Sequence, residues 1–148
     1  MMVVSILGCG WLGKPLAVWL VKKGFYVKGS TTRTEKLNEL NQLNISPFLI
    51  DISMDINIVE FLKTDVLIIA ITHKNIEDFT RLIAKIEKSP VKKVIFISTT
   101  SVYPSLNKVM NEESETIDTP HKQIEDLLRN NVNFKTTVIR FAGLFGGE

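Results

Sequence analysis

The sequence predicts an α/β domain built on a doubly wound parallel sheet, with about six strands in the order 3-2-1-4-5-6. Three observations lead to this prediction. Apolar runs alternate with helical patterns along the chain, as expected where each parallel strand is followed by a crossover helix. Some runs, such as Val66–Ile71, are entirely apolar, which suits strands that are covered on both faces. The first apolar run leads at once into a glycine-rich turn.

Each expected element has a pattern of its own. The strands are short runs rich in β-branched and aromatic residues, namely Val3–Leu7, Tyr26–Gly29, Pro47–Ile50, Val66–Ile71, Val94–Ser98 and Thr136–Phe141. The helices carry apolar residues at helical spacing, namely Trp11–Lys23, Glu35–Leu43, Ile56–Leu62, Ile76–Glu87 and His121–Asn130. We expect Pro104–Pro120 to form a long irregular loop beside the site.

The turn after the first strand has the pattern G-x-G-x-x-G, from Gly8 to Gly13. This pattern, between a strand and a helix, is typical of dinucleotide-binding Rossmann folds. Gly8 would allow the sharp turn, Gly10 the approach of a diphosphate to the backbone, and Gly13 the close packing of the helix. We expect these glycines, with Trp11 and Leu12, to contact the cofactor. An ordinary strand–turn–helix is less favoured, because the glycines coincide with both periodicities.

The end of the second strand favours NADP over NAD. NAD-binding domains place an acidic side chain there, which accepts hydrogen bonds from the ribose 2′-OH. This chain has no acidic residue there before Glu35 and offers Ser30, Thr31 and Arg33 instead. Hydroxyl groups and a guanidinium suit a 2′-phosphate, because arginine presents a planar set of donors to phosphate oxygens. We therefore expect NADP as the cofactor, with NAD as the alternative.

Further cofactor contacts are expected after the later strands, since doubly wound sheets bind ligands at the carboxyl ends of their strands. Asp51, after the third strand, would contact the adenine or instead cap the following turn. Ile71 and Thr72 lie at the end of the fourth strand, and Thr99 lies at the end of the fifth. We expect these residues at the cofactor, with Thr72 and Thr99 on its nicotinamide side.

Length and composition indicate one domain over residues 1–148. The chain is 45% apolar and carries 18 basic against 16 acidic side chains, a net charge of +2. This small, unclustered excess gives no indication of nucleic-acid binding, and no apolar run is long enough to suggest a membrane span. The single cysteine, Cys9, excludes an internal disulfide and fits a reducing, cytoplasmic setting. We expect Cys9 to fill the glycine turn rather than to act as a nucleophile.

Two further motifs give the chain a resemblance to a known family. Val94–Tyr103 reads VIFISTTSVY, and Arg140–Gly146 reads RFAGLFG. These motifs resemble the fifth- and sixth-strand signatures of the extended short-chain dehydrogenases/reductases, the sugar-nucleotide epimerase/dehydratase family. The glycine turn is similar to that of atypical NAD(P)-binding relatives of these enzymes. The resemblance covers nearly the whole chain, and the fifth-strand motif favours it over 6-phosphogluconate-dehydrogenase-like proteins.

The resemblance implies hydride-transfer chemistry. In the family, a Ser or Thr at the end of the fifth strand bonds the substrate oxygen. A Tyr, four residues before a Lys, exchanges a proton with the substrate hydroxyl while hydride moves to or from the nicotinamide. Thr99 matches the Ser/Thr and is the catalytic residue that the resemblance implies. The Tyr/Lys pair has no match, because neither Tyr26 nor Tyr103 is followed four residues later by a lysine.

Other polar residues occupy the region where the Tyr/Lys pair belongs. Asp118 and Lys122 have the required spacing, but an ionised carboxylate is a poor substitute for a tuned phenol. His121 could carry protons, since histidine ordinarily titrates near neutral pH. We favour the interpretation that His121 and Lys122 form the polar first turn of an ordinary helix.

Members of the family continue beyond the sixth strand into a smaller C-terminal substrate domain. This sequence ends at Glu148, within the sixth-strand signature, so we expect that lobe to be absent from the chain. The crevice would then lack a second wall to enclose a substrate. Exposed apolar surface would favour assembly into a homo-oligomer or with a complementing chain.

The sequence leaves three functions open. The first is an NADP-preferring domain of an epimerase/dehydratase- or reductase-like protein, which would act by hydride transfer on an unidentified small-molecule substrate when complete. The second is a non-catalytic NAD(P) sensor or binding module, which the missing Tyr/Lys pair favours. The third is the N-terminal domain of a 6-phosphogluconate-dehydrogenase-like oxidoreductase.

Overall fold

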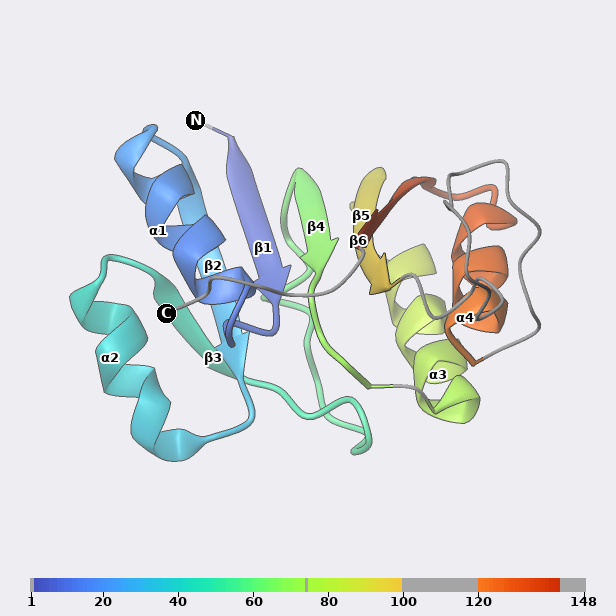
Figure 1. The fold of residues 1–148 in the computed structure, drawn as a ribbon, viewed down its shortest axis with the longest axis horizontal. Helices are drawn as coiled ribbons and strands as arrows, with labels where there is room; N and C mark the ends of the chain where they lie inside the picture. Colours follow the sequence, from blue (N-terminus) through green and yellow to red (C-terminus); the bar gives the residue numbers. More distant parts are fainter. Residues whose placement is uncertain (1, 74, 100–119, 142–148) are drawn as a thin grey trace, which may run out of the picture.

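A parallel sheet organises the chain (Figure 1). The computed structural model describes residues 2–73, 75–99 and 120–141. Six strands form one sheet in the order β3-β2-β1-β4-β5-β6, and every neighbouring pair is parallel. This is a Rossmann-like α/β fold, so the predicted fold class and strand order are confirmed. No helix within the described ranges is long and apolar enough to cross a membrane.

The elements alternate along the chain almost as predicted. The strands are β1 (Val3–Leu7), β2 (Tyr26–Thr31), β3 (Ser46–Leu49), β4 (Val66–Ile69), β5 (Lys93–Thr99) and β6 (Lys135–Phe141). The helices are α1 (Gly13–Lys22), the short 3-10 helix η1 (Thr34–Lys36), α2 (Leu37–Gln42), α3 (Ile76–Glu87) and α4 (Pro120–Arg129). Helix α1 begins at Gly13 and not at Trp11, because residues 10–12 form the turn that follows β1. Of the expected loop, Pro104–Pro120, only its last residue lies within the described residues, and it begins α4.

The two faces of the sheet bury separate apolar clusters. Helices α1 and α2 cover one face, where Val4 and Ile6 of β1 are buried. Helices α3 and α4 cover the other face, where Leu7 of β1 and Leu67 of β4 are buried. Successive side chains of a strand point to opposite faces, so the apolar run of β1 supplies both clusters. The strands are therefore apolar throughout because neither face of the sheet meets water.

The helix predicted over Ile56–Leu62 is wrong. The connection from β3 to β4 consists of turns and irregular segments there. The Asn57 side chain accepts a hydrogen bond from the Val59 N–H at 2.9 Å, which makes a local turn where the helix would begin. The apolar residues of this segment are buried against the α3 side of the sheet. Their spacing thus reflects burial and not a helical backbone.

A buried ion pair joins α4 to the edge strand β6. The Glu125 side chain has no exposed surface, and Arg140 binds its two oxygens through Nε at 3.1 Å and Nη2 at 2.5 Å. This forked geometry supplies a donor to each carboxylate oxygen, which a buried charge requires. The carboxyl half of the sheet is therefore tied to the helix that covers it.

The middle of β2 packs closely on the glycine turn. A Cβ at Gly29 would lie 2.5 Å from the Cys9 Sγ and 2.7 Å from the Ile45 Cγ2. Both separations are shorter than a real Cβ contact, so only glycine fits at this position. The sulfur of Cys9 thus occupies space that a side chain on β2 would otherwise take.

We expect Gly29→Ala to lower the free energy of unfolding by about 1–3 kcal/mol, the usual range for overpacking a core. Cys9→Ala removes one of the two clashing atoms. The double variant should therefore be more stable than the sum of the single changes predicts, by about 0.5 kcal/mol or more. Chemical denaturation of the four proteins measures this coupling. Strictly additive effects would show that Cys9 and Gly29 do not pack against each other.

Candidate functional site

A cleft lies at the carboxyl ends of the central strands, where the strand order reverses between β1 and β4. Doubly wound sheets bind their ligands at this reversal. The cleft encloses about 1280 Å³. This volume exceeds the roughly 300–1,000 Å³ of ordinary small-molecule sites. The sequence-predicted residues that line it are Gly8, Gly10, Trp11, Leu12, Thr31, Arg33, Asp51, Ile71 and Thr72.

The glycines of the turn differ in what surrounds them. Gly8 has a φ of +99°, and a Cβ there would lie 2.6 Å from the Ile71 Cγ2 and 2.9 Å from the Ala70 oxygen. A Cβ at Gly13 would overlap the Gly8 carbonyl oxygen. A Cβ at Gly10 would meet no atom within 4 Å. Gly8 and Gly13 are therefore required by packing, whereas Gly10 leaves its backbone open to the cleft.

Ser30 supports the glycine turn from beneath. Its side chain is buried, at 1% exposure, and its Oγ accepts a hydrogen bond from the Gly8 N–H at 2.8 Å. The Ser30 carbonyl accepts another from the Cys9 N–H at 2.7 Å. Neither Ser30 nor Gly13 is among the residues that line the cleft, so both shape the turn from behind it.

A group of charged side chains lies at the β2 end of the cleft. Arg33, Lys14 and Lys36 all line the cleft there, together with one carboxylate, Glu39. Glu39 forms an ion pair with Lys14 across the gap between α1 and α2, and Lys36 lies 3.5 Å from its other oxygen. The bond from Lys14 is the largest cause that lowers the pKa of the Glu39 carboxyl. The group therefore holds three cations and one anion, an excess of positive charge.

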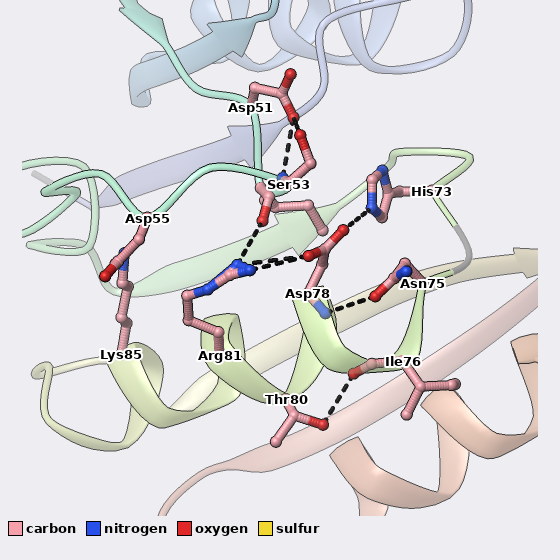
Figure 2. A network of polar contacts seen from close by, with 11 residues as sticks. Asp51, Ser53, Asp55, His73, Asn75, Ile76, Asp78, Thr80, Arg81 and Lys85 are labelled. Atoms are coloured by element: carbon pink, nitrogen blue, oxygen red, sulfur yellow. Dashed lines mark hydrogen bonds and ion pairs between the residues drawn. The ribbon is translucent and has the colours of Figure 1, made fainter.

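Asp51 lines the cleft and also caps the turn that follows β3. Its Oδ1 accepts hydrogen bonds from the Ser53 N–H at 2.9 Å and the Ser53 Oγ at 2.6 Å (Figure 2). These bonds are the main causes that lower the pKa of the Asp51 carboxyl. Both arrangements that the sequence left open for Asp51, the cap and a place at the site, are present together.

The β5 side of the cleft holds two buried polar residues, Ser98 and His121. His121 is only 5% exposed, so the polar first turn expected for α4 is not found at this residue. Ser98 is 4% exposed, and its Oγ has no hydrogen-bond partner among the described residues. An unsatisfied buried hydroxyl is uncommon and marks a place where a ligand or water could bond.

The remaining predicted residues on this side have other surroundings. Thr99 is the last residue of β5, where it pairs in register with Phe141, and its side chain is not described. Lys122 binds Asp126 at 2.7 Å on the same helix, which is an ordinary surface pair. Asp118 lies outside the described residues.

Sequence analysis missed several residues that line the cleft. Lys14, Lys36 and Glu39 come together only because α1 and α2 pack side by side, and their spacing carries no signal of that contact. His73 follows β4 within two residues of predicted positions, so its neighbourhood could have been found. Ser98 directly precedes Thr99 and was overlooked because the family resemblance points to the threonine.

Comparisons with known proteins agree on the fold. No protein-family model matches the chain. Protein YeeZ of Escherichia coli strain K12 is 24% identical over 161 aligned residues, which cover 97% of this chain and 59% of YeeZ. The chain therefore spans about three-fifths of this relative.

Solved structures with the same fold include two nucleotide-sugar epimerases. UDP-glucuronic acid 4-epimerase of Bacillus cereus, in complex with NAD, has a TM-score of 0.78 at 20% identity, covering 98% of this chain and 57% of its own. The UDP-Glc/GlcNAc 4-epimerase of Campylobacter jejuni has a TM-score of 0.77 at 18% identity, covering 98% and 56%. A protein of unknown function from Silicibacter pomeroyi has a TM-score of 0.80 at 17% identity, covering 97% and 53%. These likenesses establish the fold.

The environment of Cys9 makes its thiol unreactive. Burial raises the pKa of the Cys9 thiol from 9.0 to about 11. At pH 8 the reactive thiolate is then about a hundredfold scarcer than for an ordinary thiol, because only the thiolate attacks electrophiles. The higher basicity of that thiolate recovers about tenfold in rate.

We therefore expect iodoacetamide to alkylate Cys9 about tenfold more slowly in the folded protein than in the same protein unfolded by urea. Mass spectrometry of quenched time points measures both rates. The unfolded chain is the matched control, since it contains the same single cysteine. Equal rates in the two states would contradict the buried setting of the thiol.

Proposed function

We propose that the chain is a nicotinamide-dinucleotide-binding domain of an epimerase/dehydratase- or reductase-like protein. The observation that carries this proposal is the backbone at Gly10, which opens on the cleft with no atom near the position of a side chain. Backbone N–H groups at the start of a helix hold phosphate oxygens, and the helix dipole adds to the attraction. The fit of a diphosphate at the start of α1 thus follows from the shape of the turn.

Preference for NADP is the finer part of the proposal. The β2 end of the cleft carries Arg33, Lys14 and Lys36 against one carboxylate, Glu39. A 2′-phosphate brings negative charge, which this excess of cations would attract. The Thr31 Oγ accepts a bond from the Arg33 N–H at 3.1 Å, which helps to hold the start of the loop. NAD lacks that phosphate and would gain less from the same residues.

Hydride transfer is the chemistry that a nicotinamide dinucleotide supplies when bound. The family resemblance makes Thr99 the residue that would bond the substrate oxygen. Ser98 and His121 lie on the same side of the cleft and add polar groups there. Because this chain spans 53–59% of the relatives compared above, we propose that the substrate is enclosed together with a further segment or a partner chain.

A non-catalytic NAD(P)-binding module is the second candidate. It is favoured by the absence of a Tyr-x-x-x-Lys motif from the sequence, since that pair performs the proton transfer in the family. Oxidation of NADPH in the presence of carbonyl compounds would decide against this candidate. Binding without any turnover would favour it.

We expect NADPH to quench tryptophan emission and to raise the melting temperature. Trp11 lines the cleft at 44% exposure, whereas Trp19 is 53% exposed and is not part of the lining. Trp11→Phe should therefore remove most of the quenching, and Trp19→Phe, the matched control, should retain it. A ligand that binds only the folded state raises the melting temperature by mass action. No response to millimolar NADPH or NADH would overturn the proposed function.

We expect Arg33→Ala to weaken NADPH binding by about 1.5–3 kcal/mol, as for the loss of a charged hydrogen bond, and to leave NADH binding nearly unchanged. Isothermal titration calorimetry with both cofactors measures the difference. Lys22→Ala, in the last turn of α1 and outside the cleft lining, is the control for a general loss of positive charge. Equal losses for both cofactors would refute the role of Arg33 at the 2′-phosphate.

A further inference from the structure

A histidine lies on the rim of the cleft next to α3 and is held there by a network of polar contacts (Figure 2). The Nε2 atom of His73 lies 2.6 Å from Oδ2 of Asp78, in the first turn of α3. The ring also packs near Phe79, with 6.3 Å between ring centroids. The His73 side chain keeps 29% of its surface exposed. Its ring is thus fixed on one side and open on another.

The carboxylate that holds the ring is itself held firmly. The other oxygen of Asp78, Oδ1, accepts a bond from the Arg81 Nη2 at 2.9 Å. The Asp78 N–H donates to the Asn75 side chain at 2.9 Å, which caps the start of α3. Arg81 also reaches the Ile52 carbonyl at 3.5 Å, which connects the network to the segment after β3. Asp78 is only 13% exposed, so it cannot readily turn away.

The chemistry of this contact determines which ring nitrogen is available. A carboxylate can only accept hydrogen bonds, so Nε2 must carry the proton that it donates to Asp78. Arg81 already compensates the charge of Asp78, so the ring need not be protonated twice. In the neutral ring the other nitrogen, Nδ1, is an acceptor. No group among the described residues bonds to Nδ1, which points away from Asp78 (Figure 2).

The position of His73 suits a contact with a dinucleotide. Gly8 packs directly on Ala70 and Ile71, so the segment after β4 borders the turn where a diphosphate would lie. His73 follows two residues later and lines the same cleft as Gly10. In a dinucleotide, the groups on either side of the diphosphate are ribose rings, whose hydroxyls donate hydrogen bonds.

We propose that His73 is a further cofactor-binding residue, whose Nδ1 accepts a hydrogen bond from a ribose hydroxyl of the bound dinucleotide. Asp78 acts as a positioning residue that fixes the proton on Nε2 and the orientation of the ring. This inference rests on the proposed function, since it requires a dinucleotide in the cleft. It adds a contact from the β4 side to the glycine turn and the cationic group.

The first test compares NADPH affinity in the whole chain, measured by calorimetry. His73→Gln keeps an amide that can donate to Asp78 but has no counterpart of Nδ1, so binding should weaken about tenfold, as for one lost hydrogen bond. Lys85→Met is the matched control. It removes another contact between α3 and the segment after β3, to Asp55 and the Ile56 carbonyl, without touching His73. Its affinity should equal that of the wild type, and melting curves verify that both variants fold.

The second test observes the ring directly by long-range proton–nitrogen NMR. The chain has two histidines, so the spectrum of His73→Gln assigns the remaining signals. We expect Nε2 to be protonated and Nδ1 unprotonated in the free protein, and the Nδ1 resonance to shift when NADPH saturates the site. Wild-type binding with an unshifted Nδ1, a doubly protonated ring in the complex, or undiminished affinity of His73→Gln would overturn this inference alone. Failure of the wild type to bind NADPH would instead overturn the proposed function.

Discussion

The cleft depends on one close contact, the packing of the Gly13 Cα against the carbonyl oxygen of Gly8. This contact sets the start of α1 directly beside the end of β1. The positive φ of Gly8 then turns the chain onto Ala70 and Ile71, at the end of β4. A side chain at either glycine would push these segments apart. The position of α1 relative to both central strands therefore follows from the absence of two Cβ atoms.

A second layer of contacts supports this arrangement without reaching the cleft. Ser30 bonds the backbone of the glycine turn from below, and Gly29 leaves room for the Cys9 sulfur. The second strand is thus shaped by the turn that it supports. Both residues belong to a short stretch, 29–33, whose end also presents Arg33 to the cleft. Structural support and ligand chemistry are therefore divided between neighbouring residues of the same strand end.

The irregular connection between β3 and β4 is related to the network around His73. In a helix, the carbonyl groups of Ile52 and Ile56 would accept bonds from their own segment. Here they accept bonds from Arg81 and Lys85 of α3 instead. The same helix face thus satisfies the connection and holds Asp78 beside His73. A segment without regular structure is kept in place by cations from a helix, which orders that side of the cleft.

The sequence by itself determined the sheet, its order and the glycine turn, because apolar runs and glycine spacing report burial and backbone geometry that are local to each element. It misjudged Ile56–Leu62, where burial produces helical spacing without a helix. It also placed Ser30 at the cofactor, whereas the structure turns its hydroxyl to the Gly8 N–H. Only the tertiary structure brought Glu39 to Lys14 and Asp78 to His73, since these pairs depend on how helices pack and on where a strand ends. Side-chain partners of this kind depend on contacts between separate elements, and no pattern within one element encodes them.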